Sequence, residues 1–178
     1  MDIKRLHYTA TIKIVGLGSS GADAVNRFSG SDLEGVDLVL VHAGDPRPLT
    51  EYDADAKIGV DKGTARVSGA GGNSTGGPQA VRESEEELRE ALKDADMIVL
   101  IAGEGEESEI GVAPLIGKIA KEIGALIAGV IVNRVNLKSH DSARLEEGVQ
   151  SLREAVDMLI MVPDDTLLPG FLAALRGN

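Results

Sequence analysis

Five short apolar runs punctuate the chain, at residues 11–15, 37–41, 97–102, 126–132 and 158–162. Each is aliphatic or β-branched on consecutive positions, without the strict alternation of a strand that has one wet face. Continuous apolar runs of this length are typical of strands that are buried on both faces, as in parallel sheets. The pattern therefore predicts five core strands.

Helical patterns lie between several of these runs. One stripe begins at Val112 and ends at Gly124, a residue suited to a helix end. A second joins Leu145, Val149, Leu152 and Val156, and a third follows Pro78 with Val81, Leu88, Leu92 and Ala95. The glutamates between residues 83 and 87 read as the solvated face of that third helix.

The alternation of strands and helices predicts an α/β fold with a doubly wound, mostly parallel sheet in a single domain over residues 1–178. In such folds ligands bind at the carboxyl ends of the strands. Candidate chemistry should therefore be sought in the loops that follow the strands.

Composition narrows the function classes. The 178 residues carry a formal net charge of −11 and almost no aromatic side chains, which argues against a nucleic-acid surface. There is no cysteine, so neither a disulfide nor a thiolate metal site can form. The sequence shows no signal peptide and no membrane-spanning run, and we expect a cytoplasmic protein.

The first predicted strand runs directly into a glycine loop and then a helical stretch at residues 22–28. Glycines at such a junction permit a tight turn and a close approach to phosphate, and the helix N-terminus supplies N–H donors. The pattern alone is weak, because a turn can need glycine without any ligand. The candidate phosphate-binding residues here are Gly16, Gly18, Ser19, Ser20 and Gly21.

A second glycine-rich segment covers residues 68–77. A run of this kind costs ordering entropy unless its amides are fixed, and successive N–H groups can form an anion site. The alternative is a plain linker. Its candidate residues are Gly69, Ala70, Gly71, Gly72 and Asn73.

Together these segments resemble FtsZ, the prokaryotic cell-division GTPase related to tubulin. The resemblance runs from about residue 12 to residue 168 and includes IKIVGLGSSGADAVNRF, SGAGGN, AVRESEEELREALKDADMIVLIAG and GVAPLIGKIAKEIGAL. It implies the Rossmann-like topology of the tubulin/FtsZ nucleotide-binding domain. It also implies a GTP site made by the two glycine loops and a third loop, which in the family reads GGGTGTG.

The third loop is where this chain departs from the family. Residues 103–111 read GEGEESEIG, so Gly105, Ser108 and Gly111 keep something of the signature, and Gly103 precedes it. Asp23 stands where the family has an asparagine that faces the base, and Asp164 stands where it has an asparagine after the last strand. The family's NTD after the second strand reads Ala43-Gly44-Asp45 in this chain. The ribose-side residues fall near Leu137 and Asp141. The sequence given stops before the central helix, the loop with the catalytic carboxylate and the C-terminal domain of the family.

Three interpretations of the acidic loop compete. In the first, Glu107 or Glu109 sits at the N-terminus of the following helix and takes the place of the phosphate, so that the GTP site is lost. In the second, the glutamates are simply solvated. In the third, Glu106, Glu107 and Glu109 bind a divalent cation such as Mg²⁺, with help from Asp23 and Asp45, or bind a basic partner.

The leading hypothesis is a pseudo-GTPase without catalytic residues of its own, which docks on a protein partner, either an FtsZ or another copy of itself. An apolar stripe at residues 167–175 covers either the core of the domain or such a partner. The alternative is a domain that still binds GTP or GDP and hydrolyses it only when a partner supplies the carboxylate. A Rossmann oxidoreductase with Asp45 on the ribose is disfavoured, because the second glycine loop has no role there. His42 is interpreted as an ordinary strand-end residue.

Overall fold

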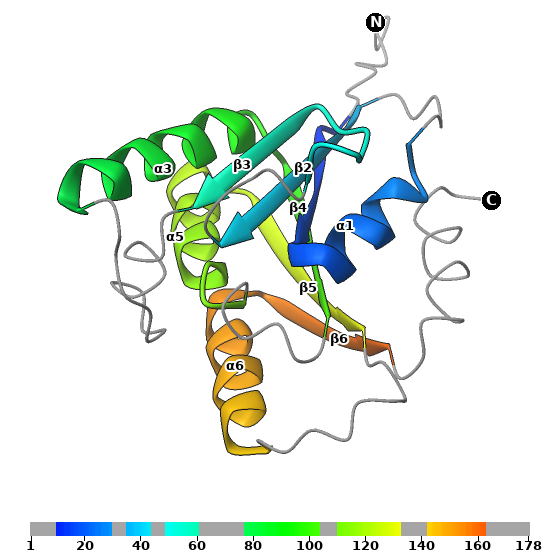
Figure 1. The fold of residues 1–178 in the computed structure, drawn as a ribbon, viewed down its shortest axis with the longest axis vertical. Coiled ribbons are helices and arrows are strands. Elements are labelled where there is room, and N and C mark those ends of the chain that lie inside the picture. Colours follow the sequence, from blue (N-terminus) through cyan, green and yellow to red (C-terminus); the bar gives the residue numbers. More distant parts are fainter. Residues whose placement is uncertain are drawn as a thin grey trace, which may run out of the picture.

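The computed structural model describes residues 10–29, 35–43, 49–60, 77–103, 110–132 and 142–162. Six strands form one sheet in the order β3-β2-β1-β4-β5-β6, and every neighbouring pair is parallel (Figure 1). This order is that of a doubly wound sheet, so the predicted α/β fold is confirmed. The strands are β1 (Ile12–Leu17), β2 (Val36–Ala43), β3 (Ala56–Val60), β4 (Met97–Gly103), β5 (Leu126–Val132) and β6 (Met158–Val162).

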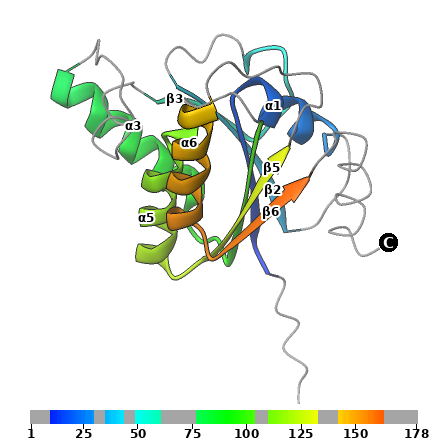
Figure 2. The ribbon, with the colours of Figure 1, turned by 90° about the horizontal axis from the view of Figure 1, so that it is seen from below.

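Helices cover both faces of the sheet. Helix α1 (Gly18–Asn26) packs on one face over β1, β2 and β4. The opposite face carries α3 (Gly77–Leu92), α5 (Ala113–Ile123) and α6 (Ser142–Ala155), as Figure 2 shows. Alternate strand residues therefore point into two separate cores: Val15, Leu17 and Ile98 join the α3/α5 side, while Ile14 and Val99 join the α1 side.

The sequence located five of the six strands but missed β3. Its residues Ala56–Val60 read AKIGV and alternate in burial, because Ile58 and Val60 face the core on the α3/α5 side whereas Lys57 points to the other, exposed face of this edge strand. The search for continuous apolar runs passed over this alternation. Helix α1 begins at Gly18, four residues before the predicted stretch, so part of the first glycine loop is already helical.

Helix α5 ends as predicted at Gly124, whose φ of 77° is in the left-handed region. The amide of Ala125 donates to the carbonyl oxygen of Ala120 at 2.9 Å, which is the closing bond of a glycine-terminated helix end. Helix α6 lies very close to α5 at Gly117. A Cβ placed on this glycine would be 2.4 Å from the Ala155 carbonyl oxygen, so the close approach requires glycine here.

Three aspartates tie the amino-terminal edge of the sheet together. Asp55, Asp96 and Asp157 each directly precede a strand, and the carboxylate of each accepts a hydrogen bond from a backbone amide of the neighbouring strand or of the residue before it. The N–H of each aspartate donates to the carbonyl of that same neighbour at 2.9 Å. In each case these two hydrogen bonds add one residue pair to the parallel pairing, just before the first regular pair of the two strands.

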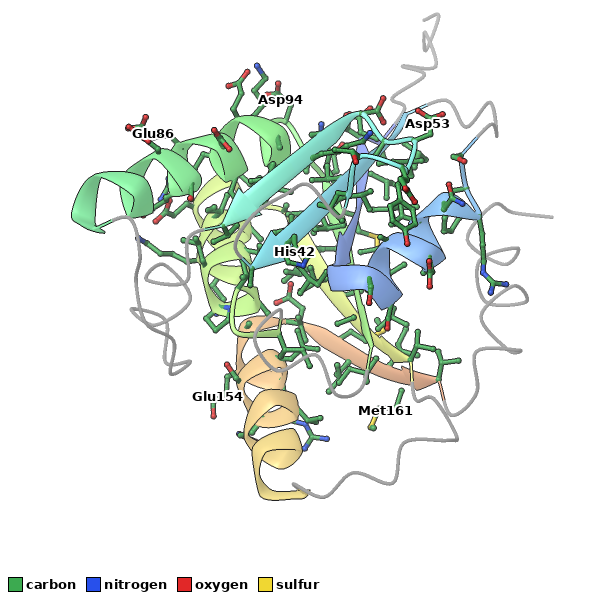
Figure 3. All side chains as sticks on the ribbon, in the orientation of Figure 1. His42, Asp53, Glu86, Asp94, Glu154 and Met161 are labelled. Carbon is green, nitrogen blue, oxygen red and sulfur yellow. The ribbon has the colours of Figure 1, made fainter. Side chains whose placement is uncertain are left out.

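Replacing Asp96 tests this arrangement. Asp96→Ala leaves the Thr11 amide without the carboxylate that accepts its hydrogen bond at 2.8 Å. We expect the free energy of unfolding in urea to fall by about 1–2 kcal/mol. Asp96→Asn keeps an oxygen acceptor and should lose less, while Asp53→Ala, at the exposed aspartate labelled in Figure 3, should lose almost nothing. Equal stability of Asp96→Ala and Asp53→Ala would contradict the role assigned to Asp96.

Candidate functional site

The carboxyl ends of β1 and β4 form the switch point of the sheet. Leu17 pairs with Ala102 at the last step of the β1–β4 ladder. Beyond this pair the chain leaves β1 into α1 on one face, whereas the chain that leaves β4 reaches α5 on the other face. The divergence of the two connections is the feature that creates ligand sites in doubly wound sheets. The first and third predicted loops both start here.

The glycines of the first loop are explained by packing. A Cβ on Gly16 would be 2.5 Å from the carbonyl oxygen of Gly21, and a Cβ on Gly21 would be 2.6 Å from the carbonyl oxygen of Ile101. Helix α1 therefore crosses β1 and β4 with its backbone in direct contact with theirs. The fold requires Gly16 and Gly21 whether or not a phosphate is bound.

Gly18 and the first turn of α1 are the part of this loop that is suited to an anion. Gly18 has a φ of 65°, which an L side chain rarely adopts. The N-cap residue of α1, Leu17, makes no side-chain capping hydrogen bond, and no acidic residue lies in the first turn of the helix. Val112, the N-cap residue of α5, makes none either, and the first turn of α5 also lacks an acidic residue. Two helix N-termini thus bring backbone N–H groups and positive dipole ends to the switch point.

Ser19 and Ser20, the other candidates of the first loop, differ in exposure. Ser19 is exposed in the first turn of α1, whereas Ser20 is 8% exposed. Ser19 is therefore the one whose hydroxyl a ligand at this edge could reach.

Charged side chains are scarce at this edge within the described ranges. The last two residues of each strand and the first turns of α1 and α5 contain no lysine or arginine. His42 is the one ionisable side chain among these positions, and Figure 3 labels it at the end of β2. It comes one residue after Val41, the partner of Leu17, which places it beside the start of α1. His42 thus lies at a strand end, as the sequence indicated, whereas its place beside α1 depends on the pairing of β1 with β2 and is not visible along the chain.

The acidic third loop is anchored at both ends. It leaves β4 at Gly103, which is buried, and returns at Ile110, which is fully buried in the α3/α5 core. Gly111 and Val112 are buried as well and lead into α5. The C-terminal end of this loop is therefore held by the core, not by solvent-exposed residues.

Asp23 has a partner that the sequence did not predict. Its Oδ1 accepts a hydrogen bond from the Tyr52 hydroxyl at 2.8 Å. Tyr52 packs against the α1-side core from the connection between β2 and β3. The bond links residues 29 positions apart, so no local pattern could have indicated it. Asp23 is exposed on α1, on the side of the helix that faces this connection.

The remaining candidates lie outside the described residues, namely Asp45, Gly69, Ala70, Gly71, Gly72, Asn73, Gly105, Glu106, Glu107, Ser108, Glu109 and Asp164. Among the described residues, no three histidine, aspartate or glutamate side chains gather as ligands of a metal ion would. No helix in the described part of the chain is both long and apolar enough to cross a membrane.

Comparison with known proteins identifies the family. A family model for the GTPase domain of the Tubulin/FtsZ family matches residues 11–169. The chain belongs to the tubulin/FtsZ family. The resemblance predicted from the glycine loops is therefore confirmed, and the switch point between β1 and β4 lies within the GTPase-type domain of this family.

Solved structures agree with this assignment. The chain is 28% identical to a tryptophan-to-tyrosine mutant of FtsZ from M. jannaschii, with a TM-score of 0.73, and covers 56% of that protein with 95% of its own length. An empty FtsZ dimer from the same organism gives 28% identity and a TM-score of 0.70, with 96% of this chain and 53% of that one covered. GDP-form protofilaments of TubZ from Bacillus thuringiensis serovar israelensis share the fold at 12% identity and a TM-score of 0.62, over 94% of this chain and 50% of TubZ. The chain thus spans about half the length of the relatives it matches.

The packing role of the first glycine loop can be tested without any ligand. In Gly21→Ala the new methyl group would clash with the Ile101 carbonyl oxygen and with Gly16, and the backbone there cannot move aside cheaply. We expect the nucleotide-free protein to lose about 2–3 kcal/mol of unfolding free energy in urea. Ser19→Ala, in the same helical turn but exposed, is the matched control and should change stability little. If the Gly21 variant were as stable as the Ser19 variant, the glycine would have to be explained by ligand binding instead.

Proposed function

We propose that this chain is an FtsZ-like domain with a degenerate GTP site, a pseudo-GTPase that acts through protein interaction, in a regulatory role related to FtsZ-type filaments. The observation that carries the proposal is electrostatic. The described part of the switch-point edge contains no lysine or arginine, while the connection from Gly103 to Ile110 inserts four glutamates and one serine. Among the described residues of this edge, no cationic side chain is available to a phosphate, and the sequence of the acidic loop adds negative charge.

The magnitude of the repulsion between a loop carboxylate and a phosphate argues against ordinary Mg-GTP binding. Two unit charges about 4 Å apart repel by roughly 4 kcal/mol at an effective dielectric constant of 20, which corresponds to about three decades of affinity before salt screening. A single carboxylate of the loop directed at the phosphates is therefore enough. A carboxylate at the N-terminus of α5 would instead be stabilised by the helix dipole and would take the place of the phosphate.

A second candidate function is retained binding of GTP or GDP, with hydrolysis only if another chain supplies a catalytic carboxylate. The two helix N-termini and the left-handed Gly18 favour it, because these groups can hold a phosphate without any cationic side chain. Bound Mg²⁺ would then offset some of the charge of the acidic loop, with Glu106, Glu107 and Glu109 as candidate ligands.

Neutralising the loop separates these two functions. In the variant Glu106→Gln, Glu107→Gln and Glu109→Gln, the pseudo-GTPase proposal predicts a gain of at least about tenfold in affinity for GDP by isothermal titration calorimetry, with the parent chain binding weakly or not at all. Ile110 is left unchanged because it is fully buried, and a threonine there would place a hydroxyl in the core.

The matched control removes the same three charges from helix α3. Glu83→Gln, Glu86→Gln and Glu87→Gln changes exposed side chains on α3, which does not start from β1 or β4. GDP affinity should therefore stay at the parent level. Tight binding by the parent chain, at Kd values below tens of micromolar, would overturn the pseudo-GTPase proposal. No gain in the loop variant would remove the loop as the cause.

The interaction role is proposed from the family. The M. jannaschii FtsZ that this chain resembles was solved as a dimer, which makes a second copy or an FtsZ the first partner to test. We expect the chain to associate with FtsZ or with itself in sedimentation velocity without added nucleotide. Sedimentation as a single monomeric species alone and in mixtures with FtsZ, over the micromolar range, would contradict this part of the proposal.

A further inference from the structure

A network of four charged side chains joins α3 to α5. Arg89 donates to Glu85 on its own helix at 2.7 Å and to Glu122 on α5. Lys118, also on α5, lies 3.5 Å from Glu85 and 4.0 Å from Glu122. Each glutamate therefore contacts both a guanidinium and an ammonium, and two of the four contacts cross between the helices.

The contacts favour the charged forms of Glu85, Glu122 and Arg89. The hydrogen bonds from Arg89 lower the pKa of Glu85 and Glu122, and their carboxylates raise the pKa of Arg89. The side chains are between 26% and 58% exposed, so dissolved salt can screen the contacts between them.

Each of the two joined helices follows a candidate loop along the chain. Helix α3 begins at Gly77, directly after the second glycine-rich segment, and α5 follows the acidic loop. Figure 1 shows the first half of α3 projecting beyond the sheet. In its second half Leu88 and Leu92 are fully buried, and Glu85 and Arg89 lie on the neighbouring turns.

We propose that this network is a salt-responsive clamp that holds α3 against α5. Apolar contact through Leu88 and Leu92 fixes the end of α3, and the charged contacts add the restraint nearer its projecting half. The clamp acts whether or not a nucleotide binds, so it does not depend on the proposed function.

Hydrogen exchange of α3 measures the clamp directly. In Arg89→Gln at low ionic strength we expect the amides of residues 77–92 to exchange about twofold to fivefold faster, the range for exposed ion pairs, while peptides from β1 and β4 stay unchanged. In 1 M NaCl the parent chain should approach the variant. Lys93→Gln is the matched control: Lys93 directly follows α3, and its substitution removes an ion pair to Glu90 on α3 and leaves the contacts to α5 intact.

Glu122→Gln provides the sharper test, because the change is made on α5 and the effect is read on α3. The clamp predicts faster exchange in residues 77–92, and the double variant with Arg89→Gln should add little to either single change. Faster exchange confined to the last turn of α5, additive effects of the two substitutions, or equal effects of Arg89→Gln and Lys93→Gln would each overturn the proposal.

Discussion

The direct contact between the backbones of α1, β1 and β4 is the constraint on which the rest of the structure depends. Gly16 and Gly21 lie against each other, and the carbonyl oxygen of Ile101 closes the contact from β4. This contact fixes where α1 starts, brings its N-terminus to the switch point and aligns the end of β4, from which the acidic loop departs. The glycines are thus conditions of the fold, and their presence in the sequence does not by itself indicate a nucleotide.

The consequence for chemistry is a separation between scaffold and charge. The chain keeps the fold of the tubulin/FtsZ family, with the sheet order β3-β2-β1-β4-β5-β6, and has a left-handed glycine at the start of α1. The loop between Gly103 and Ile110 is acidic in sequence, and Ile110 is fully buried in the core. Fold and site chemistry are separable, because function depends on the residues of the site and one fold can serve several functions.

Much of the fold could be read from the sequence, because buried parallel strands leave long apolar runs and α5 ends at a glycine. Strand β3 could not be recognised, because its residues alternate in burial and include Lys57 and Gly59. The start of α1 escaped because Gly18 and the two serines after it read as a loop, although tertiary contact at Gly21 holds them in a helix. The position of the candidate site at the carboxyl ends of β1 and β4 could be predicted from the alternation of strands and helices. The Tyr52–Asp23 bond and the Arg89 network join residues 29 and 33 positions apart, which no local pattern reveals.

We propose that the charge of the acidic loop keeps nucleotide out of the site, although the family fold is kept. The most direct test of this proposal is the nucleotide content of the chain purified under native conditions without added nucleotide, measured by chromatography of the material released on denaturation. The account predicts far less than one guanine nucleotide per chain. A content close to one GDP or GTP per chain would contradict it, because the acidic loop would then be compatible with a tightly bound phosphate.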